Sequence, residues 1–152
     1  MTRSLLATLV VGLSLMLLSA CGETEFVYNS ASFFKQDYET SYTKISDCTK
    51  SPTHGGDYVK VFADSNAAQA YSGGDPVKEG GVVVKPQYAD DGCTELTSIK
   101  AMRKGPAGTA PDKGDWEWQD VGEDGSISSE GQLGGCISCH TGCPLGDFRC
   151  QE

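Results

Sequence analysis

The most chemically distinctive segment of the chain is the run Cys136-Ile137-Ser138-Cys139-His140, near its carboxyl end. Two thiols three positions apart can add to the two vinyl groups of one haem, and the adjacent histidine is then placed to bind the iron. The spacing therefore predicts one covalently attached haem c. Cys136 and Cys139 would be its thioether anchors, and His140 would be the proximal iron ligand.

The same residues would suit two other kinds of site. Cys136, Cys139, His140 and Cys143 could form a Cys₃His zinc site, because thiolate and imidazole are the ligands that zinc prefers at such short spacings. Cys136 and Cys139 could instead form a redox-active disulfide, although the βαβ pattern expected around a thioredoxin-like motif is missing. Haem attachment is the interpretation that we favour.

The sixth coordination position of such an iron has few candidate ligands. Besides His140, the only histidine is His54, and Met102 is the only methionine outside the first 20 residues. His54 lies in a turn-like segment, where a histidine is more often a surface loop residue. Met102 lies in a predicted strand, where a methionine more often packs in the core. An open or weakly filled sixth position favours small-ligand chemistry over pure electron transfer.

The amino terminus has the pattern of an export signal. Arg3 precedes an apolar run of 14 residues, from Leu5 to Leu18, which is too short to span a membrane as a helix. The segment Leu-Ser-Ala-Cys that ends at Cys21 resembles the bacterial lipobox, in which the cysteine is lipidated. The pattern predicts a signal peptide over residues 1–20, a flexible tether over 21–32 and one domain over 33–152.

These features predict a lipid-anchored protein of the bacterial cell envelope. Gly22 follows Cys21, where an aspartate would resemble an inner-membrane retention signal, so we expect attachment to the outer membrane, facing the periplasm or the exterior. Export also supports the haem interpretation, because c-type haem is attached outside the bacterial cytoplasm.

The charge balance bears on the partners. The chain has 12 Lys or Arg against 21 Asp or Glu, a net charge of −9, which argues against a nucleic-acid partner. The acidic surface could steer a basic redox partner protein, and the haem could take a small-molecule ligand.

Four of the seven cysteines lie outside the lipobox and the haem motif. An even remainder in an exported chain implies two disulfides, for which three pairings are possible. We favour Cys48 with Cys93 and Cys143 with Cys150, the second closing a short loop behind the haem motif.

The hydrophobic patterns predict a small set of elements. Aromatic residues at spacings of four, four and three predict an amphipathic helix over residues 33–46. Strands are predicted over 58–62, 82–85, 95–103 and 115–121, with Pro86 ending the second or placing it at a sheet edge. Asp64 or Ser65 should cap a short helix that runs to Tyr71. Residues 104–114 and 122–135 are rich in glycine and read as irregular.

Several separated segments resemble the cytochrome P-460 family, in the order in which that family has them. The family consists of mostly β c-type haem proteins and includes hydroxylamine-oxidising and nitric-oxide-binding members. The resemblance covers residues 38–150 and implies an α+β, mostly β fold: an antiparallel sheet with a few short helices around one covalently bound haem c. The matching segments are Tyr58–Phe62 with Asn66-Ala67-Ala68, Gly80–Lys85, Ala101–Lys104, Gly114–Trp118, Cys136–His140 and Asp147-Phe148.

The resemblance assigns roles to two lysines. Lys85 falls on the family's lysine that bonds covalently to the haem macrocycle, although many relatives carry an acidic residue where this chain has Pro86. The alternative is an exposed lysine at a sheet edge. Lys100 falls where hydroxylamine-oxidising members carry a glutamate over the open iron face. An ammonium group cannot accept substrate protons as a carboxylate can, which weakens the case for hydroxylamine oxidation. Lys100 could instead stabilise an anionic ligand or a haem propionate, or face solvent.

The expected function is that of an exported single-haem c-type cytochrome. It would act in electron transfer or in binding and oxidation of small nitrogen compounds such as nitric oxide or hydroxylamine. Oxidation of such compounds would make it a haem-dependent oxidoreductase. The alternative is a surface lipoprotein stabilised by disulfides and zinc, without redox activity.

Overall fold

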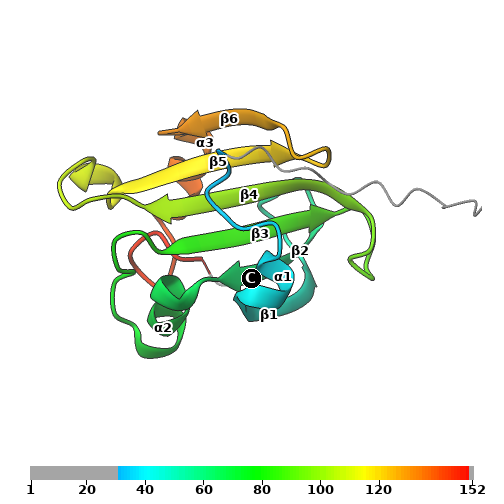
Figure 1. The fold of residues 1–152 in the computed structure, drawn as a ribbon, viewed down its shortest axis with the longest axis horizontal. Coiled ribbons are helices and arrows are strands. Elements are labelled where there is room, and N and C mark those ends of the chain that lie inside the picture. The colour runs from blue at the N-terminus through cyan, green and yellow to red at the C-terminus, as the bar shows by residue number, and fades with distance from the viewer. Residues whose placement is uncertain (1–30, 151–152) are drawn as a thin grey trace, which may run out of the picture.

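The computed structural model describes residues 31–150 as a six-stranded antiparallel sheet in which every strand lies beside its neighbours in sequence, from β1 to β6 (Figure 1). The predicted α+β, mostly β class is confirmed. The predicted signal peptide, Cys21 and most of the predicted tether lie outside these residues. No helix in the described part of the chain has the length and apolar character needed to cross a membrane. The strands are β1 Thr43–Lys50, β2 Tyr58–Ala63, β3 Val82–Tyr88, β4 Leu96–Lys104, β5 Trp116–Gly122 and β6 Ile127–Gly131.

The helices are short and lie on both sides of the sheet. They are α1 Tyr38–Ser41, α2 Ser65–Gly73 and α3 Gly134–His140, with a 3-10 turn at Pro111–Lys113. The predicted cap of α2 is confirmed: the Asp64 carboxylate accepts hydrogen bonds from the amides of Asn66, at 3.1 Å, and Ala67, at 2.9 Å. Such a side chain satisfies amide groups that the first helical turn leaves unbonded.

The predicted helix over residues 33–46 is wrong for most of its length. Only α1 is helical, and β1 begins at Thr43 and pairs with β2. The aromatic residues of this segment still pack inward, because Phe34 and Tyr38 are buried against Phe62. The 122–135 segment also contains a strand, β6, which has no buried residue. Both strands lie at sheet edges, where one-sided packing leaves only a weak alternating pattern.

Pro86 neither ends a strand nor lies at a sheet edge. It is fully buried inside β3, which has β2 on one side and β4 on the other. The register of β2 with β3 passes from Val59–Gln87 to Phe62–Val84, so Pro86 falls at a break in this ladder. The missing N–H of Pro86 therefore removes no regular ladder hydrogen bond to β2. On the other side, Pro86 remains paired with Ile99 of β4.

The sheet separates two apolar clusters. One face carries Val83, Met102 and Trp118 and is packed against α2 and α3; the other carries Val84, Ile99 and Val121 and is covered by the segment around α1. Figure 1 shows the blue amino-terminal segment in front of the sheet, with α3 and the red carboxyl-terminal segment behind it. The face behind the sheet also holds the chemistry predicted from the sequence.

The structure contains the two favoured disulfides, Cys48–Cys93 and Cys143–Cys150. The first joins edge strand β1 to the β3–β4 turn across 45 positions, so in the unfolded chain it closes a long loop. Replacing both of its cysteines with serine should lower the free energy of unfolding by about 4 kcal/mol, mainly by releasing that loop. Urea titration of the haem-loaded protein, followed by circular dichroism, measures the loss. The C143S/C150S protein, whose cysteines are 7 positions apart, should lose less. Equal losses would contradict the loop-length argument.

Candidate haem-binding site

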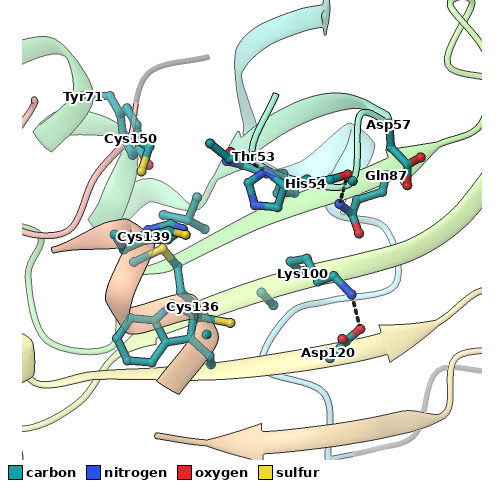
Figure 2. A pocket seen from close by; sticks show the side chains of 18 residues that line it. Thr53, His54, Asp57, Tyr71, Gln87, Lys100, Asp120, Cys136, Cys139 and Cys150 are labelled. Atoms are coloured by element: carbon teal, nitrogen blue, oxygen red, sulfur yellow. Dashed lines mark hydrogen bonds and ion pairs between the residues drawn. The ribbon is translucent and has the colours of Figure 1, made fainter. Parts of the chain in front are cut away.

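A cavity of about 470 Å³ opens on the α3 side of the sheet. Its floor comes from β3, β4 and β5, and its walls come from α2, α3 and the loop between β1 and β2 (Figure 2). This size lies within the range of small-molecule and cofactor pockets. The cavity brings together all the haem-site candidates of the sequence: Lys85, Lys100, Cys136, Cys139, His140, His54 and Met102.

Cys136 and Cys139 lie one turn apart on α3, and both are free thiols that line the cavity. Residues three apart on a helix share a face, which is the arrangement needed to reach two substituents of one ring system. Partial burial raises the pKa of the Cys136 thiol, and the negative charge of Asp120 raises it further. The Cys136 thiol is therefore protonated at neutral pH.

His140 has the geometry of a metal-binding imidazole. Its Nδ1 lies 2.8 Å from the carbonyl oxygen of Phe148. Because a carbonyl can only accept, Nδ1 carries the proton, and in the neutral imidazole the lone pair is then on Nε2. Metal-binding histidines commonly have such a bond on the second nitrogen, which fixes the tautomer and the ring orientation. Trp118 packs edge-on against the ring, with 6.4 Å between the centroids.

The bonding of the cysteines bears on the two competing sites. Cys143 is bonded to Cys150, so the proposed Cys₃His zinc set lacks one thiolate. The ligand atoms of His140, Cys143 and Cys150 do lie within 4.8 Å of one another, but two of them are the sulfurs of that bond. Cys136 and Cys139 are both free thiols in the structure, the state in which they can attach a haem.

Lys85 lies in the interior of the sheet rather than at an exposed edge. It is only 7% exposed, in β3, and its side chain is on the cavity face with Val83 and Gln87. The alternative interpretation, an exposed edge lysine, is therefore wrong.

Lys100 is held in an ion pair rather than facing solvent alone. Its Nζ lies 2.5 Å from Oδ1 of Asp120, its register partner on β5, and the two side chains are 31% and 33% exposed. Figure 2 shows this pair on the sheet below His54. Asp120 was not among the sequence candidates. The strand alternation that turns Trp116 and Trp118 inward also places Asp120 on the same face of β5. The sequence pattern could therefore have identified Asp120 as a cavity residue.

His54 lies in the cavity wall and not only on a surface loop. Its Nδ1 lies 2.8 Å from the hydroxyl of buried Ser51 and 3.1 Å from that of Thr53, and its backbone oxygen accepts a bond from Gln87. These contacts hold the ring against the loop, with its other edge toward the cavity (Figure 2). Met102 is 5% exposed in the core cluster, as its strand position predicted, and its side chain also reaches the cavity floor.

The donor set of the cavity fits a c-type haem: two thiols one turn apart, an imidazole with its Nε2 lone pair fixed, and an apolar wall that includes Val83 and Trp118. No curated protein matches the sequence. The sequence model of the family described as Cytochrome P460 matches residues 34–148, which is most of the chain. The chain therefore belongs to the cytochrome P460 family and is a c-type haem cytochrome.

Proposed function

We propose that this cytochrome binds and oxidises small nitrogen compounds, such as nitric oxide or hydroxylamine, at one covalently held haem. The observation that carries the proposal is the cavity itself. It places His54 and the Lys100–Asp120 pair in the same space as the haem motif, so polar groups stand beside an otherwise apolar ligand site. A site of this composition suits a small polar ligand.

The roles of the chain's own residues follow from their positions. When bound, the haem supplies an iron centre that exchanges electrons and takes small ligands. Cys136 and Cys139 anchor it to α3, and His140 offers Nε2 to the iron. Lys100 can donate a hydrogen bond to an anionic ligand from Nζ.

Asp120 provides the proton acceptor that oxidation of hydroxylamine requires. Lys100 alone could not accept substrate protons, but the carboxylate 2.5 Å from its Nζ can. Asp120 thus supplies a proton acceptor from β5, whereas the sequence had indicated only the cationic Lys100 on β4. This supports hydroxylamine oxidation as the activity to test first.

The membrane anchor and the redox partner are also part of the proposal. The Cys21 lipobox and the net charge of −9 support a protein that is anchored by lipid to the bacterial cell envelope and passes electrons to a basic redox partner.

A second candidate function is that of an electron carrier, and His54 is the observation that favours it. With Nδ1 held by hydroxyls, His54 could present Nε2 to the iron as a sixth ligand. A six-coordinate iron would have no site for substrate.

Replacing His54 with alanine separates the two functions. We expect the iron of the wild-type protein to be high-spin, and H54A to leave its spin state unchanged. Losing one hydrogen bond to the bound ligand should weaken nitric oxide binding about tenfold. Optical and electron paramagnetic resonance spectra with nitric oxide titration measure both. P52A, in the same loop, serves as the control. A low-spin wild-type protein that becomes high-spin in H54A would instead establish the electron carrier.

A further inference from the structure

The segment after α3 is fastened to the sheet by one acidic residue. Asp147 forms an ion pair with Lys104 at the end of β4, and both side chains are only 13% exposed. Its Oδ2 accepts a hydrogen bond from the amide of Val77 at 2.8 Å, and its backbone oxygen accepts one from the Trp116 indole at 3.0 Å. Asp147 therefore joins three parts of the chain that are far apart in sequence.

The next residue touches the predicted iron ligand. The carbonyl oxygen of Phe148 accepts the hydrogen bond from Nδ1 of His140 at 2.8 Å. Phe148 directly follows Asp147, so the contacts of Asp147 help to fix where that carbonyl lies. The amide of Arg149, in the same peptide group as the carbonyl, donates a hydrogen bond to the Gly146 carbonyl at 3.0 Å and holds it from the other side.

The backbone at this point has an unusual conformation. Asp147 and Phe148 have φ angles of 49° and 59°, in the left-handed region that residues with a side chain rarely adopt. Such conformations persist only where surrounding contacts impose them. The Phe148 ring also packs so closely on Gly114 that a Cβ there would lie 2.7 Å from it. The carbonyl is thus held by packing as well as by the ion pair.

We propose that Asp147 is a positioning residue for His140: its ion pair with Lys104 fixes the Phe148 carbonyl, and that carbonyl sets the orientation and basicity of the imidazole. This inference rests on the proposed ligation of haem iron by His140. A strong hydrogen bond from Nδ1–H increases electron donation from Nε2 to a metal, which stabilises the oxidised state. Asp147 would thereby lower the midpoint potential without touching the haem.

Asp147→Asn in the haem-loaded protein tests this role. Asparagine keeps the shape of the side chain and tolerates the left-handed backbone, but it removes the ion pair. We expect the midpoint potential to rise and the iron–histidine stretching frequency of the reduced protein to fall. Redox titration and resonance Raman spectroscopy measure these, and neither depends on turnover.

Three further variants make the test specific. K104M should shift both readouts in the same direction, and it remains informative if D147N does not fold. K104R should keep the wild-type values, because it retains the ion pair. E117Q is the control: it also removes an ion pair of β4, the Arg103–Glu117 pair, but this one joins β4 to β5 at 2.7 Å and is about 40% exposed.

The outcomes separate this inference from the proposed function. Shifts in D147N and K104M with none in E117Q would support it. Wild-type potential and frequency in D147N, or in K104M if only that variant folds, would overturn it. If the wild-type iron–histidine band persists in an H140A variant, the proposed ligation by His140 fails instead.

Discussion

Replacing both Cys136 and Cys139 with serine, in a K85M background that excludes a bond from Lys85 to the macrocycle, should abolish covalent attachment of haem. Each thiol can form one thioether, and both line the same cavity from α3. A serine hydroxyl is a much weaker nucleophile than a thiol, so no equivalent ether should form. The haem that survives denaturation should fall by about tenfold or more in the double variant and stay detectable in each single variant. A haem-stained denaturing gel of protein made with a cytochrome c maturation system measures this.

The matched control is the C48S/C93S protein. It also loses two cysteines, but these form a disulfide between β1 and the β3–β4 turn and do not line the cavity. Its haem stain should equal that of the wild type. Full staining of C136S/C139S would contradict the prediction and would place covalent attachment at another residue.

The same double variant should also be poorly folded around the cavity. None of the residues of α3 is buried, although Cys136 and Ile137 pack against the core cluster. A haem in the cavity would provide the apolar surface that this helix otherwise lacks. Hydrogen exchange should therefore become faster in α3 and in the segment that follows it, while the β3–β4–β5 ladder keeps its protection.

The central part of this fold was predictable because its residues alternate between two buried environments. Residues of β4 and β5 pack alternately into the two apolar clusters, so the strand period of two is visible in the sequence. The edge strands β1 and β6 lack this signal, since their exposed positions are free of a packing constraint. In residues 33–46 the aromatic spacing arises from contacts with the sheet rather than from a helix.

The site was predictable where chemistry depends on local spacing and not where it depends on pairing across the sheet. The thiols and imidazole of residues 136–140 lie within two helical turns, so their order alone indicates haem chemistry. Asp120 becomes relevant only because β4 and β5 place it opposite Lys100. Asp147 lies 43 positions from Lys104, and His54 lies 33 positions from Gln87, so no short motif could reveal their contacts.

Replacing Lys85 with methionine should remove a red-shifted, broadened Soret band and leave an ordinary c-type spectrum. The reason lies in the register of the sheet, which places Lys85 of β3 opposite Lys100 of β4, both on the cavity face. Lys85 is 7% exposed among the cavity residues, and Lys100 is held in an ion pair with Asp120 at the more exposed part of the floor. Of the two lysines, Lys85 is therefore the one suited to attack the macrocycle.

The bond itself has a direct chemical signature. Joining Nζ of Lys85 to a macrocycle carbon replaces one N–H and one C–H bond, and the two electrons released must pass to an oxidant such as peroxide. Protease digestion of the wild-type protein should then yield a haem that links a Lys85 peptide to the Cys136–Cys139 peptide, while K85M should yield haem on the cysteine peptide alone. K100M is the matched control, because it removes the opposite lysine and should keep the two-peptide product. A wild-type digest with haem on one peptide would leave Lys85 unlinked, and the protein would then favour gas binding or electron transfer over hydroxylamine oxidation.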